Sequence, residues 1–66
     1  MRAKDLRVGD IIWIDNYQAT ILSMMKNSGG YDFILEIPQV RPLVDFHIYR
    51  WINRTNEIGF ISRPSS

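Results

Sequence analysis

Hydrophobic residues in this chain recur in short runs, often at every second position, and turn-forming residues separate the runs. Alternation with a period of two is typical of strands that bury one face. The pattern predicts five strands, at residues 11–14, 19–25, 31–37, 43–52 and 57–61. The first seven residues are expected to form a lead-in or one short turn of helix, and residues 62–66 a flexible tail.

The segments between the runs carry the residues that turns require. Asp15, Asn16 and Tyr17 form the first predicted turn, because Asp and Asn tolerate left-handed backbone angles. Residues 26–30 end in two glycines and give the strongest turn signal, so the second and third strands should form a hairpin. Residues 38–42 contain two prolines, which cannot donate ladder hydrogen bonds, so this segment is expected to be an extended connection or a corner.

Composition supports the same fold class. The chain has 66 residues, which is enough for a single domain only. Isoleucine, valine and aromatic residues, which favour strands, supply most of its apolar side chains, whereas alanine occurs only twice. We therefore predict an all-β domain of five strands that curl into a small barrel, because curling encloses a core and shortens the exposed sheet edges.

Alternation also assigns the side chains to two faces. The predicted core consists of Val8, Ile12, Ile14, Ala19, Ile21, Phe33, Leu35, Ile37, Phe46, Ile48, Ile58 and Phe60. The opposite face would present seven large hydrophobic residues, namely Ile11, Trp13, Leu22, Met24, Ile34, Tyr49 and Trp51. That is more apolar surface than a small monomer usually exposes. Either some of these assignments are wrong, or another copy or a ligand covers this face.

Small size favours the second interpretation. Chains of this length that lack disulfides or a structural metal often gain stability by oligomerising, and this chain has no cysteine. We therefore expect a homo-oligomer. Its predicted interface contains Ile11, Trp13, Leu22, Met24 and Ile34.

Residues 6–14 resemble the entry strand of Src-homology-3-like (SH3-like) small barrels, including the KOW-type nucleic-acid modules. In these barrels a glycine and an acidic residue precede alternating inward aliphatic residues, as Gly9 and Asp10 precede Ile12 and Ile14 here. The resemblance covers about fifteen residues and implies a five-stranded SH3-like barrel more than any activity, because such barrels host many functions.

The sequence offers little for catalysis, metal binding or membrane insertion. His47 is the only imidazole, and Asp45 could orient it, but no serine lies in a nucleophile motif. These two residues would give a metal ion at most two ligands. We therefore predict a protein that is not an enzyme and needs no cofactor or metal. No hydrophobic run is long enough to cross a membrane or to form a signal peptide, so a cytoplasmic location is expected.

Charge and aromatic residues together suggest a binding site in the later part of the chain. Residues 41–66 carry four arginines against two acidic residues, whereas residues 1–40 carry four basic and five acidic residues. Aromatic rings offer stacking planes for bases, and arginine pairs with phosphate. The predicted ligand-binding residues are Trp13, His47, Tyr49, Arg50, Trp51 and Arg54.

Two functions fit this pattern. The leading expectation is a binding module for an anionic aromatic ligand, either a nucleotide or single-stranded nucleic acid, which the oligomer could sequester. A net charge of +1 disfavours a long-range grip on duplex DNA. The alternative is a protein-interaction module that docks on a partner protein and inhibits or recruits it. Salt discriminates between them, because phosphate binding weakens with salt and apolar docking persists.

Overall fold

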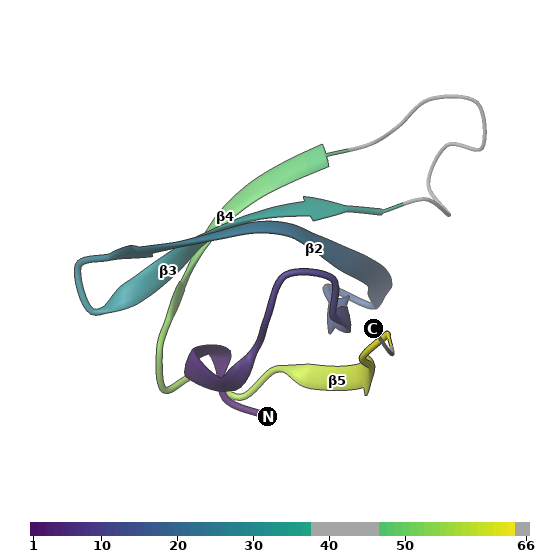
Figure 1. The fold of residues 1–66 in the computed structure, drawn as a ribbon, viewed down its shortest axis with the longest axis horizontal. Helices are drawn as coiled ribbons and strands as arrows, with labels where there is room; N and C mark the ends of the chain where they lie inside the picture. The colour runs from purple at the N-terminus through teal and green to yellow at the C-terminus, as the bar shows by residue number, and fades with distance from the viewer. Residues whose placement is uncertain (38–46, 65–66) are drawn as a thin grey trace.

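The part of the chain that the structure describes forms five strands and one short 3₁₀ turn (Figure 1). This computed structural model describes residues 1–37 and 47–64. The elements in chain order are the 3₁₀ turn η1 (Ala3–Asp5) and the strands β1 (Ile11–Ile14), β2 (Tyr17–Asn27), β3 (Gly30–Glu36), β4 (His47–Asn53) and β5 (Gly59–Ser62). The short turn expected in the first seven residues is confirmed as η1.

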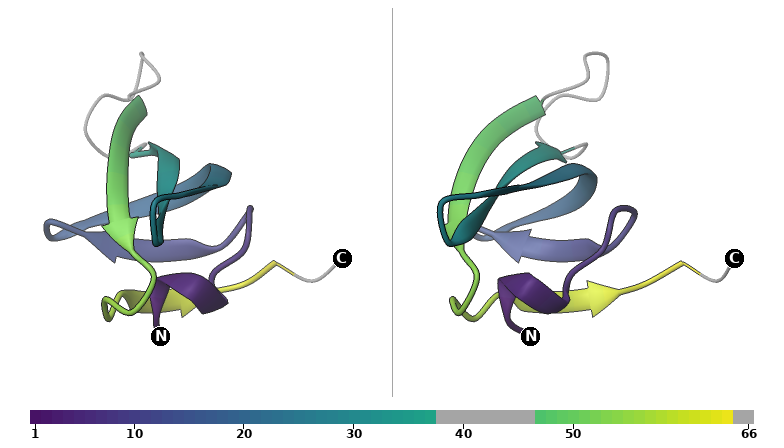
Figure 2. Two further views of the ribbon diagram at one scale, coloured as in Figure 1. Left: turned by 90° about the vertical axis from the view of Figure 1, so that its left-hand side faces the viewer. Right: turned by 60° about the vertical axis from the view of Figure 1, so that its left-hand side comes forward.

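The strands form one antiparallel sheet in the order β4-β3-β2-β1-β5. In Figure 1, β2, β3 and β4 make a long curved layer, with η1 and β5 beneath it. Figure 2 shows that β4 runs across the direction of β5. Within residues 1–37 and 47–64, no pairing between β4 and β5 closes the sheet. The prediction of an all-β domain is confirmed, and the curled sheet is compatible with an SH3-like small barrel.

Two tight turns set the register of the first three strands. Asp15 and Asn16 have φ angles of 49° and 71°, and Ser28 and Gly29 have φ angles of 48° and 78°. Positive φ at both central residues of a two-residue turn matches the right-handed twist of the flanking strands. The first turn is therefore shorter than predicted, because Tyr17 already pairs with Ile14 in the ladder. β2 therefore begins before the predicted 19–25, and it also ends later, because Lys26 and Asn27 pair with Tyr31 and Gly30.

The other strand boundaries shift by a few residues. The third predicted strand, 31–37, lies at 30–36, and the fifth, 57–61, lies at 59–62. The fourth is described only from His47 onward, and the rest of its predicted range lies outside the described residues. Of the predicted tail, 62–66, Ser62 belongs to β5 and the Arg63 guanidinium binds the Asp10 carboxylate, whereas residues 65 and 66 lie outside the described residues.

A bulge in β2 changes which side chains face the core. Ile21 pairs with Leu35 but Ser23 pairs with Ile34, so Leu22 is an extra residue between them. One inserted residue reverses the alternation that follows it. The predicted place of Met24 on the outward face is therefore wrong: it pairs with the buried Phe33 and packs against the core.

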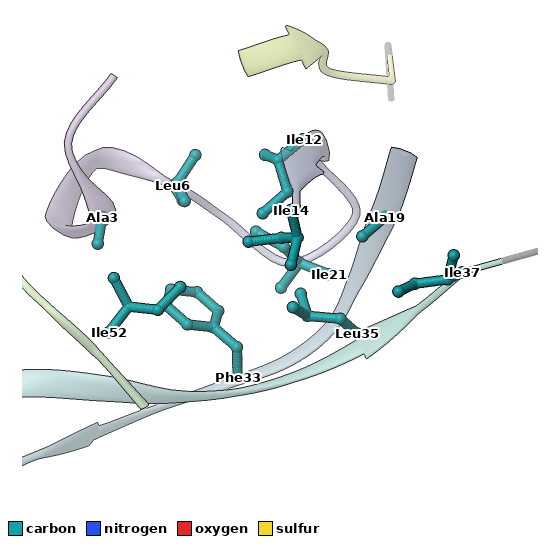
Figure 3. Packing of buried hydrophobic residues seen from close by; sticks show 10 residues of the cluster. All are labelled: Ala3, Leu6, Ile12, Ile14, Ala19, Ile21, Phe33, Leu35, Ile37 and Ile52. Carbon is teal, nitrogen blue, oxygen red and sulfur yellow. The ribbon is translucent and has the colours of Figure 1, made fainter. Parts of the chain in front are cut away.

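The core fills the space between the curved layer and the segment formed by η1 and β1 (Figure 3). Its buried residues are Ala3, Leu6, Ile12, Ile14, Ala19, Ile21, Phe33, Leu35, Ile37 and Ile52. Ile48 and Ile58, two predicted core residues, pack against it and are partly buried. Phe46, a third, lies outside the described residues.

Two predicted core residues are exposed. Val8 is 60% exposed, because residues 7–10 form a turn in which the Asp10 amide donates to the Arg7 carbonyl at 3.1 Å. Phe60 is 36% exposed on the edge strand β5, where the Arg63 guanidinium covers its ring at 5.6 Å. Alternation placed both residues inward, but one lies before its strand and the other lies at the edge of the sheet.

The N-terminal segment supplies core residues that the alternation did not predict. The amides of Ala3 and Lys4 donate to the carbonyls of Asn56 and Arg54, at 3.0 and 3.1 Å. These bonds tie the segment to the connection between β4 and β5. As a result, Ala3 and Leu6 are buried against the sheet.

Candidate binding site on the outer face

The face of β2, β3 and β4 that points away from the core carries a hollow of about 340 Å³. Six of its lining residues alternate with the buried ones, and they are called the outer face from here on: Ser23, Met25, Asp32, Ile34, Tyr49 and Trp51. Phe33 and Arg50 complete the lining, although alternation directs both side chains to the opposite face. A volume of this size lies within the usual range for ligand pockets.

Cross-strand register brings the outer face together in two rows. Tyr49 pairs with Ile34, which pairs with Ser23. In the neighbouring row, Trp51 pairs with Asp32, which pairs with Met25. Side chains directly opposite each other in an antiparallel pair are in contact range, so each row is a continuous strip across three strands.

Asn27, at the end of β2, holds the Trp51–Asp32 pair in place. The Trp51 Nε1–H donates to the Asn27 carbonyl at 2.8 Å, and the Asn27 Nδ2–H donates to the Asp32 Oδ2 at 2.8 Å. The Trp51 ring also lies over Gly30, where an added Cβ would come within 2.7 Å of two ring atoms. Only glycine permits this approach, so the hairpin and the ring position depend on each other.

Several apolar side chains of the outer face are open to solvent. Tyr49 is 79% exposed, Met25 65% and Trp51 45%. Tyrosine and tryptophan are the residue types most often found at the energetic centre of protein interfaces. The sequence predicted Tyr49 and Trp51 as neighbours on one face, and the structure places both in the lining of the hollow.

The charges of this part of the sheet are acidic. Asp32 lies within the hollow, and Glu36 lies beside it, with its Oε2 at 3.6 Å from the His47 Nε2. Among the described residues of β2, β3 and β4, lysine and arginine occur only at Lys26 and Arg50. Alternation directs both of these to the opposite side of the sheet.

Arg50 lines the hollow, but its guanidinium bonds to Asp15, which is not among the lining residues. Its Nη2 donates to the Asp15 Oδ2 at 2.6 Å, which joins the edge strand β4 to the turn between β1 and β2. Each partner favours the charged form of the other. The hydrogen bond from Arg50 therefore lowers the pKa of Asp15, and the same bond raises the pKa of Arg50.

The structure does not gather all the predicted ligand-binding residues. Trp13 lies on β1, and the strands β2 and β3 separate it from Trp51 on β4. The Trp13 side chain covers Gly59 of β5. His47 pairs with Glu36 at the far end of β4 from the hairpin. Arg54 follows β4, where its amide donates to the Gly29 carbonyl at 3.3 Å. None of these three lines the hollow.

The predicted oligomer interface is also divided. Ile11 and Trp13 lie on β1, whereas Ile34 lines the hollow on β3. Leu22 occupies the bulge and is exposed. Asn27 and Asp32, which complete the site, had no signal in the sequence, because their role depends on the hairpin register.

The described residues contain no group of three or more His, Asp or Glu side chains that could hold a metal ion. In the same residues, no helix has the length and apolar character needed to span a membrane. The side chains that line the hollow offer aromatic faces, a thioether, a hydroxyl, a carboxylate and the Arg50 guanidinium.

Comparison of the chain with protein-family models, with curated proteins and with solved structures finds no match. The case for a function consequently depends on the geometry of the outer face.

Proposed function

We propose that this protein is a non-enzymatic interaction module that docks a partner protein on its outer face. The observation that carries the proposal is an exposed aromatic pair, Tyr49 and Trp51, in a hollow whose lining includes the Asp32 carboxylate. The basic residue of that lining, Arg50, is bonded to Asp15. Aromatic side chains in a concave surface are typical of protein recognition sites.

The alternative of an anionic aromatic ligand has less support at this site. A phosphate needs basic groups, but Arg50 binds Asp15 and the outer face contributes Asp32. Asp32 and Glu36 would both repel a phosphate that approached the rings. Binding of a nucleotide or of single-stranded nucleic acid, and formation of a homo-oligomer, stay predictions.

Selection of short peptides from a random displayed library tests the proposal. We expect selected peptides to bind the native protein and to lose about tenfold or more in affinity for Tyr49→Ala. Tyr49 makes no side-chain hydrogen bond within the described residues, so its removal should leave the fold intact. Circular dichroism and the melting temperature check this.

Tyr17→Ala is the matched control, because Tyr17 is also an exposed tyrosine but lies outside the hollow. Peptides that bind both variants equally well would place the interaction elsewhere. Tight binding of adenosine monophosphate or of a single-stranded oligonucleotide, lost in Tyr49→Ala, would overturn the proposal in favour of the anionic ligand.

A further inference from the structure

The hollow contains a prearranged pair of an aromatic ring and a carboxylate. Trp51 and Asp32 are cross-strand partners, and Asn27 is bonded to both, through its carbonyl to Trp51 and through its side-chain amide to Asp32. The Ser28 hydroxyl in turn donates to the Asn27 Oδ1 at 3.1 Å. The ring and the carboxylate are therefore fixed relative to each other before any ligand arrives.

The carboxylate retains binding capacity. Asp32 is exposed, and the bond from Asn27 uses one lone pair of its Oδ2, so its Oδ1 has no partner within the described residues. An ionised carboxylate accepts several hydrogen bonds through its two oxygens. A donor that reaches the Trp51 face can therefore also reach Asp32.

Local electrostatics select a cation for this place. Alternation places Asp32, Glu36 and the titratable His47 on the outward side of β2, β3 and β4, within the described residues. Arg50 also lines the hollow, but it is bonded to Asp15. The negative face of an aromatic ring attracts a cation directly, and a neighbouring carboxylate adds to that attraction. Arg50 does not cancel the charge of Asp32, since Asp15 already balances the Arg50 guanidinium.

We infer that the hollow receives an arginine side chain of the partner protein, stacked on Trp51 and hydrogen-bonded to Asp32. This inference rests on the proposed docking function and names the group that is recognised. Arginine fits better than lysine, because its planar guanidinium stacks on an aromatic face while its N–H groups remain in plane to bind a carboxylate. Tyr49, on the same face of β4, offers a second apolar surface to the stem of that side chain.

A blocked arginine, N-acetyl-arginine methylamide, is the probe. Blocked citrulline has nearly the same shape without the charge, and blocked lysine has the charge without the plane. The two tryptophans give two indole N–H signals in a nitrogen-15 NMR spectrum. We expect the Trp51 signal to shift with arginine and the Trp13 signal to stay, because Trp13 lies outside the hollow.

Citrulline should bind about tenfold more weakly than arginine, and lysine should lie between them. Asp32→Asn should remove most of the difference between arginine and citrulline. Asp5→Asn is the charge-matched control, because Asp5 is an exposed carboxylate on η1, and it should leave the difference unchanged.

Three results would overturn the inference: no shift of Trp51 at the highest arginine concentration, equal binding of citrulline, or an unchanged preference in Asp32→Asn. If selected peptides still depend on Tyr49 in those cases, the docking function stands and only the arginine is wrong. If neither the peptides nor the probe binds at the hollow, both proposals fail. A shift of Trp51 with adenosine monophosphate alone would favour an anionic ligand and overturn both.

Discussion

The two aspartates that flank β1 both pair with an arginine from the C-terminal part of the chain, yet their surroundings are opposite. Asp10 is fully buried, and both of its oxygens accept from Arg63, at 2.9 and 3.0 Å. The Arg7 amide also donates to it, at 2.9 Å. Asp15 has a side chain that is 64% exposed, and a single contact from Arg50 holds it.

This difference separates an interaction that holds the fold from one that shapes the surface. A buried carboxylate that loses its partners keeps its desolvation cost, so the cluster at Asp10 stabilises the end of the molecule where the N-terminal segment meets the residues that follow β5. An exposed pair gains little, because water screens it. The main consequence of the pair at Asp15 is that the charge of Arg50, which lines the hollow, is already balanced.

The largest expected effect is that of Asp10→Asn. The change removes the charge that three N–H groups bind and turns an amide donor toward Arg63. A hydrogen bond to a charged group contributes about 1.5–3 kcal/mol to stability. The free energy of unfolding of a domain of this size is only about 3–5 kcal/mol. We expect the melting temperature to fall by about 10 °C.

Urea unfolding followed by circular dichroism measures this effect, with Asp15→Asn as the control in the same experiment. The control should shift the unfolding midpoint far less, because its carboxylate is already in water. Equal shifts in the two variants would contradict the distinction between the pairs.

Acidic pH should reveal the same contrast between Asp10 and Asp15, with a smaller effect on the free energy of unfolding. The hydrogen bonds from Arg63 lower the pKa of Asp10 although burial opposes them, and the bond from the Arg7 amide adds to the lowering. A carboxyl whose pKa is lower in the folded state contributes its full stability above its unfolded pKa of about 3.9. That contribution is lost as the pH falls through the lower pKa of the folded state.

We therefore expect the free energy of unfolding to decline from about pH 5 downward, and to decline less steeply in Asp10→Asn. The pKa of Asp15 is also lowered, by Arg50, so Asp15→Asn should remove a smaller part of the slope. Unfolding free energies measured at a series of acidic pH values test this. Identical slopes in the native protein and in Asp10→Asn would assign the acid sensitivity to other carboxyl groups.

The sequence predicts the strands well because their signal is local. Period-two alternation marks β1 and β3, and residues that accept positive φ mark both tight turns. The prediction from alternation fails at Leu22, because no residue type marks the inserted residue of a bulge. This single insertion moves Met24 from the predicted outward face to the core side. Ala3 and Leu6 are missed for another reason: their burial depends on hydrogen bonds from this segment to residues fifty or more positions away.

In the candidate site, too, the sequence predicts the local features and misses those that depend on contacts between strands. Tyr49 and Trp51 share a face because they are two residues apart on one strand, which the sequence shows. The role of Asn27 depends on how β2, β3 and β4 align, and the Arg50–Asp15 pair depends on how far the sheet curls. Both features depend on tertiary structure, which local sequence patterns do not show. For this reason the sequence assigns Arg50 to a ligand, whereas the structure pairs it with Asp15.

The smallest effect on the fold is expected from Arg50→Ala, and it separates the two candidate ligands. Its partner is exposed, so the melting temperature should change by no more than a few degrees. Because Asp15 already balances the Arg50 guanidinium, blocked arginine should shift the Trp51 indole signal as it does in the native protein. An anionic ligand predicts the opposite, since loss of this cation would weaken adenosine monophosphate and flatten the salt dependence of its binding. Titration of Arg50→Ala with both probes, at low and high salt, therefore decides the role of Arg50: weaker binding of the nucleotide with no response to arginine would return Arg50 to the binding site.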